Sequence, residues 1–443
     1  MSKPFFINHM MIFDPQKIHN AGDVMKGTSG NTGNSYITYS LVKELYNWNC
    51  DFRGIQNIWA YDYSQSEREL DYINNEADTV FLNLQDHIRP VESQFSCDYE
   101  KLNDFVKKIK KQVNVIGIGA NCLHGYDIEI YKRLPESLKN LLYTLADKTS
   151  YIGVHGEFTA NVLEKLGISN VKIIGCPTFY ETGKDHIVTK KNIVSPNEIV
   201  FTNIYKLGVV EKQPVILQSE SDIMDAVLGN PLRFFGKDAK FDTFLNTWID
   251  GRFKFFTSVT AWKEFIKPFK FALGSRVHGG VIAMNSGCPA VCLNGDARSR
   301  EMCSVLKMPC LPEMKASYPM KIWEKADYDE YNKNYNKIYE NYVDFIKSTT
   351  GLDVISSSQD SFFVDDIDIQ KHFCESFGKK IAKLCYTQTK ENEQLKVKKT
   401  SIDKVQVCKF DNLRIRLLSH ITFGKTKKYY QKKWREIKKV LKK

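Results

Sequence analysis

The sequence lacks any apolar stretch long enough to cross a membrane. A spanning helix needs about 20 consecutive apolar residues, and no run in the 443-residue chain approaches this length. The first residues also lack the charged and then apolar pattern of a secretory leader. These absences favour a cytoplasmic protein over a secreted or membrane-spanning one.

The cysteines lack the spacing of a metal-binding or disulfide framework. Eleven are present, an odd number, and no two form a Cys-x-x-Cys pair, the spacing by which zinc and redox sites are usually recognised. Cys288 and Cys292 flank or occupy an apolar segment, which is typical of small buried residues. The sequence therefore predicts no disulfide framework and no metal site.

The body of the chain lacks an excess of charge. From residue 391 onward the sequence has 17 Lys and Arg against 5 Asp and Glu, whereas the preceding part has 46 against 47. Proteins that bind nucleic acids usually carry a basic footprint on the fold itself. We therefore expect no nucleic-acid partner, and the net charge of +11 divides into +12 on the C-terminal tail and −1 on the rest of the chain.

Strand and helix patterns alternate along the chain, which is typical of α/β domains. The chain is long enough for two domains with a sizeable core each. Residues 183–197 are polar and are predicted to link an N-terminal domain, 1–182, to a C-terminal domain, 198–390, that ends in a helical extension. Five tyrosines of the extension recur at intervals of three or four residues and predict a packing face: Tyr328, Tyr331, Tyr335, Tyr339 and Tyr342.

A glycine-rich loop precedes the first amphipathic helix, which is predicted at residues 37–48. The loop spans residues 27–36 and reads GTSGNTGNSY. Small residues at a helix start favour a bound anion, because the amides are free and the helix dipole attracts negative charge. The spacing matches neither the Walker motif nor the dinucleotide fingerprint, so a purely structural turn is the alternative.

Residues 255–311 carry most of the candidate chemistry. They predict a helix, a buried strand, the turn GSRVHGG, a second helix, a second buried strand and the loop NGDARSRE. Arg276 and His278 in the turn combine a bidentate cation with a group that titrates near neutrality, which suits an anionic substrate that needs proton transfer. A plain helix cap, with Arg276 paired to Glu301, is the alternative.

These elements resemble the polysaccharide pyruvyl transferase family. That family carries a G-[ST]-R-x-H-G turn, a helix that ends in G-x-P, and a D-x-R-[ST]-R-E loop. Residues 274–279, 287–289 and 296–301 match these motifs in order and spacing.

The N-terminal half also follows the family. Residues 31–34 resemble its N-x-G-[DN] element, and residues 117–121 resemble its G-x-G-[AS] turn. The register of residues 151–177 agrees as well. One position departs, because the arginine that helps to hold phosphoenolpyruvate in relatives is His155 here.

The resemblance, which covers about residues 20–310, implies two Rossmann-like domains that face each other across a cleft, as in GT-B folds. It implies an enzyme that transfers pyruvate from phosphoenolpyruvate to two hydroxyls of a sugar in a surface polysaccharide or its lipid-linked precursor, forming a ketal. Phosphoenolpyruvate is then the donor substrate, and no cofactor is expected. A GT-B glycosyltransferase that uses a nucleotide sugar is the rival expectation, and a non-enzymatic assembly factor at the membrane is a third.

The resemblance also implies roles for individual residues. His278 would act as the acid and base, with Arg276 beside it. Arginines would hold the carboxylate and phosphate of the donor, His155 would join them if protonated, and Asn31, Asn34 and Asp296 would orient sugar hydroxyls. The residues expected to bind substrate are Gly30, Asn31, Gly33, Asn34, His155, Ser275, Asp296, Arg298, Arg300 and Glu301.

The tail at residues 391–443 is predicted to contain a basic amphipathic helix. Between residues 423 and 443, Tyr430, Trp434, Ile437 and Leu441 share one helical face among ten Lys or Arg. Such a helix binds anionic membranes, and each basic residue near the surface contributes about 1 kcal/mol. We therefore expect a peripheral protein at the inner face of the membrane, where a sugar or lipid-linked oligosaccharide is the acceptor. A solvated or disordered tail is the alternative.

Overall fold

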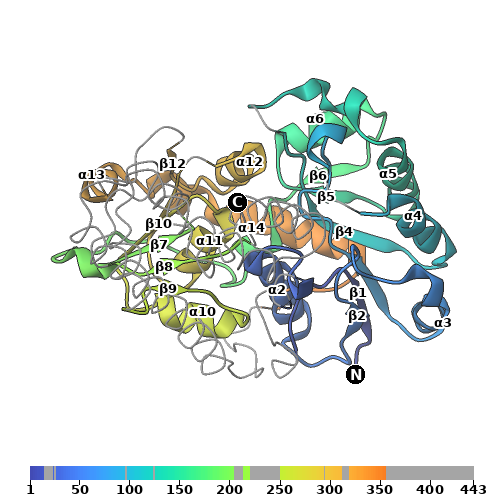
Figure 1. Cartoon of the computed structure of the whole chain (residues 1–443), viewed down its shortest axis with the longest axis horizontal. Coiled ribbons are helices and arrows are strands. Elements are labelled where there is room, and N and C mark those ends of the chain that lie inside the picture. The colour runs from blue at the N-terminus through green and yellow to red at the C-terminus, as the bar shows by residue number, and fades with distance from the viewer. Residues whose placement is uncertain are drawn as a thin grey trace, which may run out of the picture.

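Two parallel six-stranded sheets organise the protein, as the computed structural model shows (Figure 1). The structure describes residues 1–13, 23, 26–94, 97–122, 125–203, 213–219, 250–293, 295–311 and 319–355. The expectation of two α/β domains is confirmed by these sheets. The predicted domain boundaries stay predictions, and the tail at 391–443 lies outside the described residues.

The N-terminal sheet has the strand order β2-β1-β3-β4-β5-β6. Its strands are β1 Pro4–Ile7, β2 Arg53–Ile55, β3 Thr79–Leu82, β4 Val113–Ile118, β5 Ile152–Val154 and β6 Val171–Ile173. The helices of this half are α2 Ser35–Tyr46, α3 Glu67–Asn75, α4 Tyr99–Lys108, α5 Glu136–Lys148 and α6 Glu157–Lys165. Short 3-10 helices are η2 Thr32–Asn34, η3 Tyr63–Gln65, η4 Val91–Ser93, η5 Ile128–Arg133, η6 Pro177–Phe179 and η7 Pro196–Glu198.

The C-terminal sheet has the strand order β12-β11-β10-β7-β8-β9. Its strands are β7 Ile199–Thr202, β8 Val215–Ile216, β9 Phe253–Lys254, β10 Phe271–Gly274, β11 Ala290–Leu293 and β12 Cys310–Leu311. The helices that accompany it are α10 Val259–Ile266, α11 Val277–Asn285, α12 Ala297–Leu306, α13 Pro319–Lys325 and α14 Asp329–Thr350.

The central strands are buried on both faces. Every residue of β1, β4, β7, β10 and β11 is buried, which explains why these segments are continuous apolar runs rather than alternating ones. One apolar cluster combines α2 with the C-terminal strands and with side chains of β1, β3 and β4. The two halves therefore share a packed core in addition to the chain segment that connects them.

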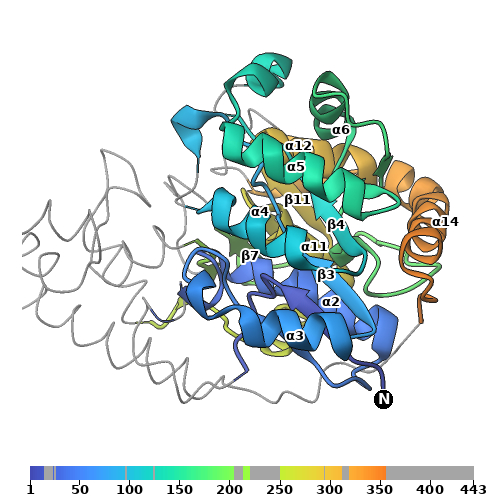
Figure 2. The same ribbon diagram turned by 90° about the vertical axis from the view of Figure 1, so that its right-hand side faces the viewer.

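Helix α14 extends from the C-terminal half along the N-terminal sheet, as Figures 1 and 2 show. Lys172 on β6 donates a 3.1 Å hydrogen bond to the hydroxyl of Ser348. The ring of Phe345 packs against Gly153 on β5, where a Cβ atom would lie 2.7 Å from it. The last turns of α14 thus belong to the surface of the N-terminal half.

The tyrosines of the extension form a packing face, as predicted. All five are buried, and Tyr342 stacks on Tyr180 with 4.3 Å between ring centroids. The hydroxyl of Tyr342 donates to the carboxylate of Glu44 at 2.6 Å. Among the helices in the described ranges, none combines the length and apolar character needed to span a bilayer.

Candidate active site between the two sheets

The carboxyl ends of the two parallel sheets meet, which is where open α/β sheets bind ligands. Gly119 follows β4, His155 follows β5, and the helix that follows β11 brings Arg298 to the same place. A Cβ atom on Gly119 would lie 3.0 Å from Cγ of Arg298 and would collide with the ring of His155. Glycine is therefore required here by the ring of His155 in the same half, and Arg298 of the C-terminal half approaches the same point.

His278 lies in the first turn of α11, directly after the turn that ends β10. Its ring is buried, with Nε2 3.7 Å from the sulfur of Cys176 and Nδ1 without a hydrogen-bonding partner among the described residues. Burial, followed by the positive charge of Arg298, lowers the pKa of His278 to about 3. The ring is therefore neutral at pH 7 in the ligand-free protein.

His155 is a second buried neutral imidazole. Burial lowers its pKa well below the ordinary value, and the charge of Arg298 and the neighbouring His278 lower it further. The expectation that His155 binds an anion through a positive charge required a protonated ring. In the ligand-free protein this condition is not met, so the ring can offer an N–H but no charge.

Arg298 is a buried cation that is incompletely paired. Its side chain lies in the first turn of α12, with Nη1 3.7 Å from Oδ1 of Asp86, and its Nε has no hydrogen-bonding partner within the described part of the chain. A buried guanidinium is stable only when hydrogen bonds and negative charge compensate its desolvation. Arg298 consequently has capacity left for an anionic ligand.

A hydrogen-bonded network around Asp86 holds Arg298 and connects the two halves. Asn121 donates from Nδ2 to Asp86 at 3.2 Å and to Asp296 at 2.8 Å. Burial raises the pKa of Asp86, but the charges of Arg89 and Arg298 outweigh it and leave the pKa well below its usual range. Asp86 is therefore ionised.

Asp296 caps the N-terminus of α12, so residues 297–301, which were predicted as a loop, form the start of a helix instead. Its Oδ1 accepts a 2.8 Å hydrogen bond from the backbone N–H of Ser299, which is a helix N-cap. Burial raises the pKa of Asp296, and the negative charge of Asp86 raises it further. The charge of Arg298 and the hydrogen bonds from Ser299 outweigh both effects, so the pKa is lowered overall. Its second oxygen accepts from Asn121 across the interface.

The glycine-rich loop is connected to the C-terminal half through Gln218. Oδ1 of Asn31 accepts from Nε2 of Gln218 at 3.0 Å and from the backbone N–H of Gly33 at 2.9 Å. Thr32 donates its N–H to the carbonyl of Gln218 at 2.9 Å. A Cβ atom on Gly33 would lie 2.9 Å from Cβ of His278, so this loop packs directly against the predicted acid–base residue.

Three further residues of the predicted site stabilise their own loops. Asn34 donates from Nδ2 to the carbonyl of Thr28 at 3.1 Å, and Gly30 has the left-handed φ of +76°. The hydroxyl of Ser275 donates to the carbonyl of Asn203. The substrate-binding roles expected for Gly30, Asn34 and Ser275 stay predictions.

Glu301 contacts the N-terminal half through Thr159. Its carboxylate accepts from the backbone N–H at 3.1 Å and from the hydroxyl at 2.5 Å, and the same hydroxyl accepts from the N–H of Ala120 at 2.7 Å. Burial raises the pKa of Glu301 to about 7. The carboxyl group is therefore close to half protonated at neutral pH.

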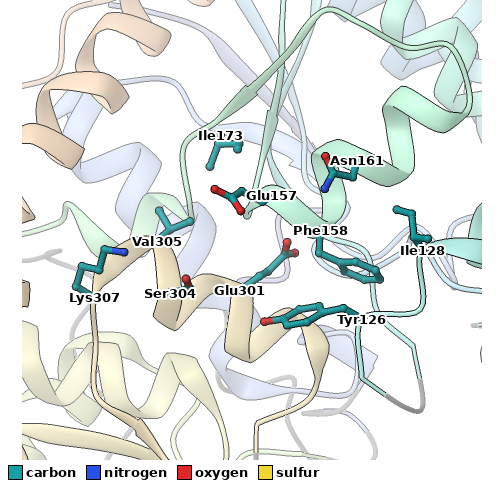
Figure 3. A pocket seen from close by; sticks show the side chains of 10 residues that line it. All are labelled: Tyr126, Ile128, Glu157, Phe158, Asn161, Ile173, Glu301, Ser304, Val305 and Lys307. Carbon is teal, nitrogen blue, oxygen red and sulfur yellow. The ribbon is translucent and has the colours of Figure 1, made fainter.

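A pocket of about 590 Å³ opens between the two halves beside Glu301 (Figure 3). The rings of Tyr126 and Phe158 lie 5.2 Å apart, and the guanidinium of Arg300 lies 5.4 Å above the Tyr126 ring. The lining residues come from the N-terminal half and from α12 and the residue that follows it: Tyr126, Ile128, Glu157, Phe158, Asn161, Ile173, Glu301, Ser304, Val305 and Lys307.

The structure brings His278, His155, Arg298 and Asp296 into one interface, with Asn31 and Gly33 beside it. The analysis of spacing missed five residues of this interface: Asp86, Asn121, Thr159, Cys176 and Gln218. Two of them had a usable signal in the sequence, because Asp86 and Gln218 lie just after the short apolar segments that form β3 and β8, at the carboxyl edge where ligands bind.

A curated-protein comparison gave no match. Among solved structures, a Methanocaldococcus jannaschii UDP-GlcNAc 2-epimerase in complex with UDP-GlcNAc and UDP has 12% identity and a TM-score of 0.41, over 79% of this chain and 100% of that chain. Staphylococcus aureus MnaA with UDP has 12% identity and a TM-score of 0.35, over 77% of this chain and 90% of that chain.

The comparison with family models identifies the family of the chain. The sequence model of the polysaccharide pyruvyl transferases matches residues 31–296, which is more than half of the chain. This range includes residues 31–36 of the glycine-rich loop, the turn with Arg276 and His278, and Asp296. The resemblance read from the motifs is thereby confirmed, and the chain belongs to the polysaccharide pyruvyl transferase family of transferases.

Proposed function

We propose that this pyruvyl transferase uses phosphoenolpyruvate as its donor and forms a cyclic ketal on one sugar of a surface polysaccharide or its lipid-linked precursor. The observation that carries the proposal is that the buried His278 lies within electrostatic range of the incompletely paired Arg298 between the two sheets. The donor has a carboxylate and a phosphate, and both are suited to guanidinium groups. Arg276 and Arg298 would bind them.

The reaction moves two hydroxyl protons. The first sugar hydroxyl attacks C2 of the donor, and a proton joins the methylene carbon, which becomes the methyl group. The bond from C2 to the phosphate oxygen then breaks, and the second hydroxyl attacks C2 to close the ketal. Its proton leaves with the phosphate, so the products are the ketal and inorganic phosphate.

His278 would carry the proton between the hydroxyl and the methylene carbon. In the ligand-free protein the ring is neutral and can accept a proton. Bound negative charge raises the pKa of a neighbouring histidine, so the donor itself would increase the basicity of the ring. This brings the pKa toward the range in which one group serves as both base and acid.

His155 would contact the donor as a neutral hydrogen-bonding group. Relatives in this family have an arginine at the matching position, which adds a charge that His155 does not supply. The proposal therefore includes weaker donor binding than an arginine would give. The same departure keeps a glycosyltransferase with a nucleotide-sugar donor as the second candidate.

The acceptor sugar would enter through the pocket of Figure 3. Sugars present both apolar ring faces and hydroxyl groups, and the pocket combines the rings of Tyr126 and Phe158 with the carboxyl groups of Glu157 and Glu301. Glu301 adjoins Gly156, where a Cβ atom would lie 2.9 Å from its Oε2. The pocket thus borders the segment that carries His155.

A donor comparison tests the proposal. Phosphoenolpyruvate should raise the melting temperature of the protein, and phosphate should be released when a pyruvylatable acceptor is added. Nucleotide sugars serve as the matched alternative donors in the same assay. Stabilisation by a nucleotide sugar, with no effect of phosphoenolpyruvate, would replace the proposal by the glycosyltransferase alternative.

The proposed location is the inner face of the membrane, where lipid-linked precursors are presented. The support is the sequence of the basic tail at residues 391–443, which has 17 Lys and Arg. Attraction of such a segment to anionic lipids would keep the enzyme near its acceptor.

A further inference from the structure

Three cysteines from three different elements of the C-terminal half meet in the fold. Cys292 lies on β11, Cys303 on α12 and Cys310 on β12, and their sulfur atoms all lie within 4.8 Å of one another. The fold explains the meeting, because Cys292 and Cys310 are direct neighbours in the parallel pairing of β11 with β12. Helix α12 connects these two strands and places Cys303 against them.

The trio is buried, and its distances suit a metal ion. Cys292 and Cys303 are each 1% exposed, and Cys310 is half-buried. Zn–S bonds of about 2.3 Å in a tetrahedral site place the sulfur atoms about 3.8 Å apart. A contraction of about 1 Å would therefore convert the trio into a ligand set. Thiolate ligands select thiophilic ions such as Zn²⁺ and Cu⁺ over Mg²⁺ or Ca²⁺.

A positive charge lies beside the trio. A Cβ atom on Gly295 would lie 3.5 Å from the sulfur of Cys292 and 3.6 Å from Cγ of Arg300, so the loop before α12 packs on the cluster. The guanidinium of Arg300 acts electrostatically on Cys310. Three thiolates with one divalent cation carry a net charge of −1, and Arg300 offsets it.

We propose that Cys292, Cys303 and Cys310 bind one thiophilic metal ion, with Zn²⁺ as the expected occupant. The ion would connect β11, α12 and β12 and so fix the start of α12, where Asp296 and Arg298 lie. Its role is structural, because its three ligands lie on β11, α12 and β12, whereas His278 lies on α11. The absence of a Cys-x-x-Cys pair hides such a site from sequence rules, since the three ligands come from three different elements.

Zinc titration of the full-length protein, purified without metal under reducing conditions, tests the site. Competition with a chromophoric chelator gives affinity and stoichiometry, and Cd²⁺ reports sulfur ligation through its charge-transfer absorption. The wild type should bind one ion per chain through sulfur. Cys292→Ser, Cys303→Ser and Cys310→Ser should each bind at least about 100-fold more weakly, since loss of outer-shell partners alone costs about 10–100-fold.

Cys288→Ser is the matched control, because Cys288 is also buried in this half but lies outside the trio. It should bind like the wild type. The triple variant measures binding by all other cysteines. The proposal is overturned if the wild type binds no more Zn²⁺ than the triple variant, or if Cys288→Ser loses as much affinity as the trio variants.

A melting experiment keeps the test decisive where a variant folds poorly. Ligand binding to the native state alone raises the melting temperature, so Zn²⁺ should stabilise the wild type. Cys310→Ser is the mildest change, because Cys310 is half-buried in a short strand at the sheet edge. Equal stabilisation of wild type and Cys310→Ser would contradict the site.

Discussion

His278 and His155 lie beside the guanidinium of Arg298, and this neighbourhood sets their protonation. Burial disfavours the imidazolium form of each ring, and the charge of Arg298 disfavours it further. A donor with a phosphate and a carboxylate at the same arginine reverses the second effect. The protonated form of His278 therefore belongs to the donor complex rather than to the free protein.

Replacement of His278 by alanine should lower turnover by about 10²–10⁴-fold, the usual contribution of a general acid or base. The fold should survive, because the ring's hydrogen-bonding contact is one 3.7 Å approach to the sulfur of Cys176. Phosphate release from phosphoenolpyruvate plus acceptor measures the effect. Release at the wild-type rate would refute the role of His278.

The pH dependence of the wild type checks the same assignment. The ratio kcat/KM reports the free enzyme, in which a base with a pKa of about 3 stays deprotonated over the working range. The value of kcat reports the complex, where bound anions raise the pKa of His278, so its acid limb should lie at higher pH. The argument would be contradicted if the acid limbs of the kcat/KM and kcat profiles both lay near the ordinary histidine pKa of about 6.5.

His155→Arg should retain or strengthen the binding of phosphoenolpyruvate. The substitution restores the charge that family relatives have, whereas the native ring is neutral because burial and Arg298 lower its pKa. The rise of melting temperature with donor concentration gives the affinity. His155→Gln is the uncharged control and should show no gain. A folded His155→Arg variant that no longer responds to the donor would argue against a donor site here.

Glu301→Gln should stabilise the protein at alkaline pH. Burial raises the pKa of Glu301 to about 7 from an ordinary 4.5, so the native state binds more protons than the unfolded state between these values. Stability is then fully present below about 4.5 and falls, by on the order of 3 kcal/mol, as the pH rises to about 7. Glutamine keeps an acceptor for Thr159 and does not ionise.

Urea unfolding at pH 5 and pH 8 measures this effect. The stability gain of Glu301→Gln should be small at pH 5 and largest at pH 8. Glu157→Gln is the control, because Glu157 lines the same pocket but is exposed. An equal gain of Glu301→Gln at both pH values would show that burial does not hold the proton.

At the scale of elements, one buried carboxylate joins α2 to α10. Glu181 forms ion pairs with Lys43 on α2 and with Lys263 on α10, the latter at 2.7 Å. The hydroxyl of Tyr36 donates to it at 2.9 Å. Burial raises the pKa of Glu181, but the two lysines outweigh burial and lower it overall.

Glu181→Ala should destabilise the protein by about 3–5 kcal/mol, because it leaves two buried ammonium groups without their carboxylate. The lowered pKa means that the ion pairs stabilise the fold above about 4.5 and that this contribution is lost as the pH falls through the folded-state pKa. Urea unfolding at pH 7 gives the size. Glu340→Ala removes an exposed pair with Lys184 and should cost at most about 1 kcal/mol; similar losses in both variants would contradict the burial argument.

Sequence patterns predicted the buried strands well and the edges poorly. The apolar runs that became β10 and β11 are recognisable because both faces are covered. By contrast, β2 consists of Arg53, Gly54 and Ile55 and is a strand only because β1 pairs with it. The contact of Gln218 with Asn31 could not be predicted either, because it depends on how the two sheets meet and leaves no pattern in the local sequence.

At the scale of the whole molecule, the two halves hold each other through groups expected to bind substrate. Asn31 accepts from Gln218, Asp296 accepts from Asn121, and Glu301 accepts from Thr159. Amide and carboxylate oxygens can accept more than one hydrogen bond, so in the proposed function Asn31 and Asp296 would orient sugar hydroxyls while these bonds hold them in place. The core shared by the two halves, to which α14 contributes, limits how far they can separate.

The basic tail is the remaining large-scale feature, and its sequence predicts attachment to a membrane. Residues 1–390 have 46 Lys and Arg against 47 Asp and Glu, whereas residues 391–443 have 17 against 5. Such a division is typical of a segment with its own anionic partner. In the predicted helix the lysines would meet lipid phosphates, while Trp434 and Leu441 would enter the headgroup region.

Deletion of residues 424–443 should abolish co-sedimentation with anionic liposomes and leave activity on a soluble acceptor near normal. High salt should release the full-length protein, because salt screens the attraction. The screening length is about 10 Å at 0.1 M salt and becomes shorter at higher concentrations. A variant with Trp434→Ser and Leu441→Ser keeps the charge and loses the apolar anchors, so it should bind more weakly than the wild type and remain salt-sensitive. Co-sedimentation that persists after the deletion would assign the membrane contact to another surface.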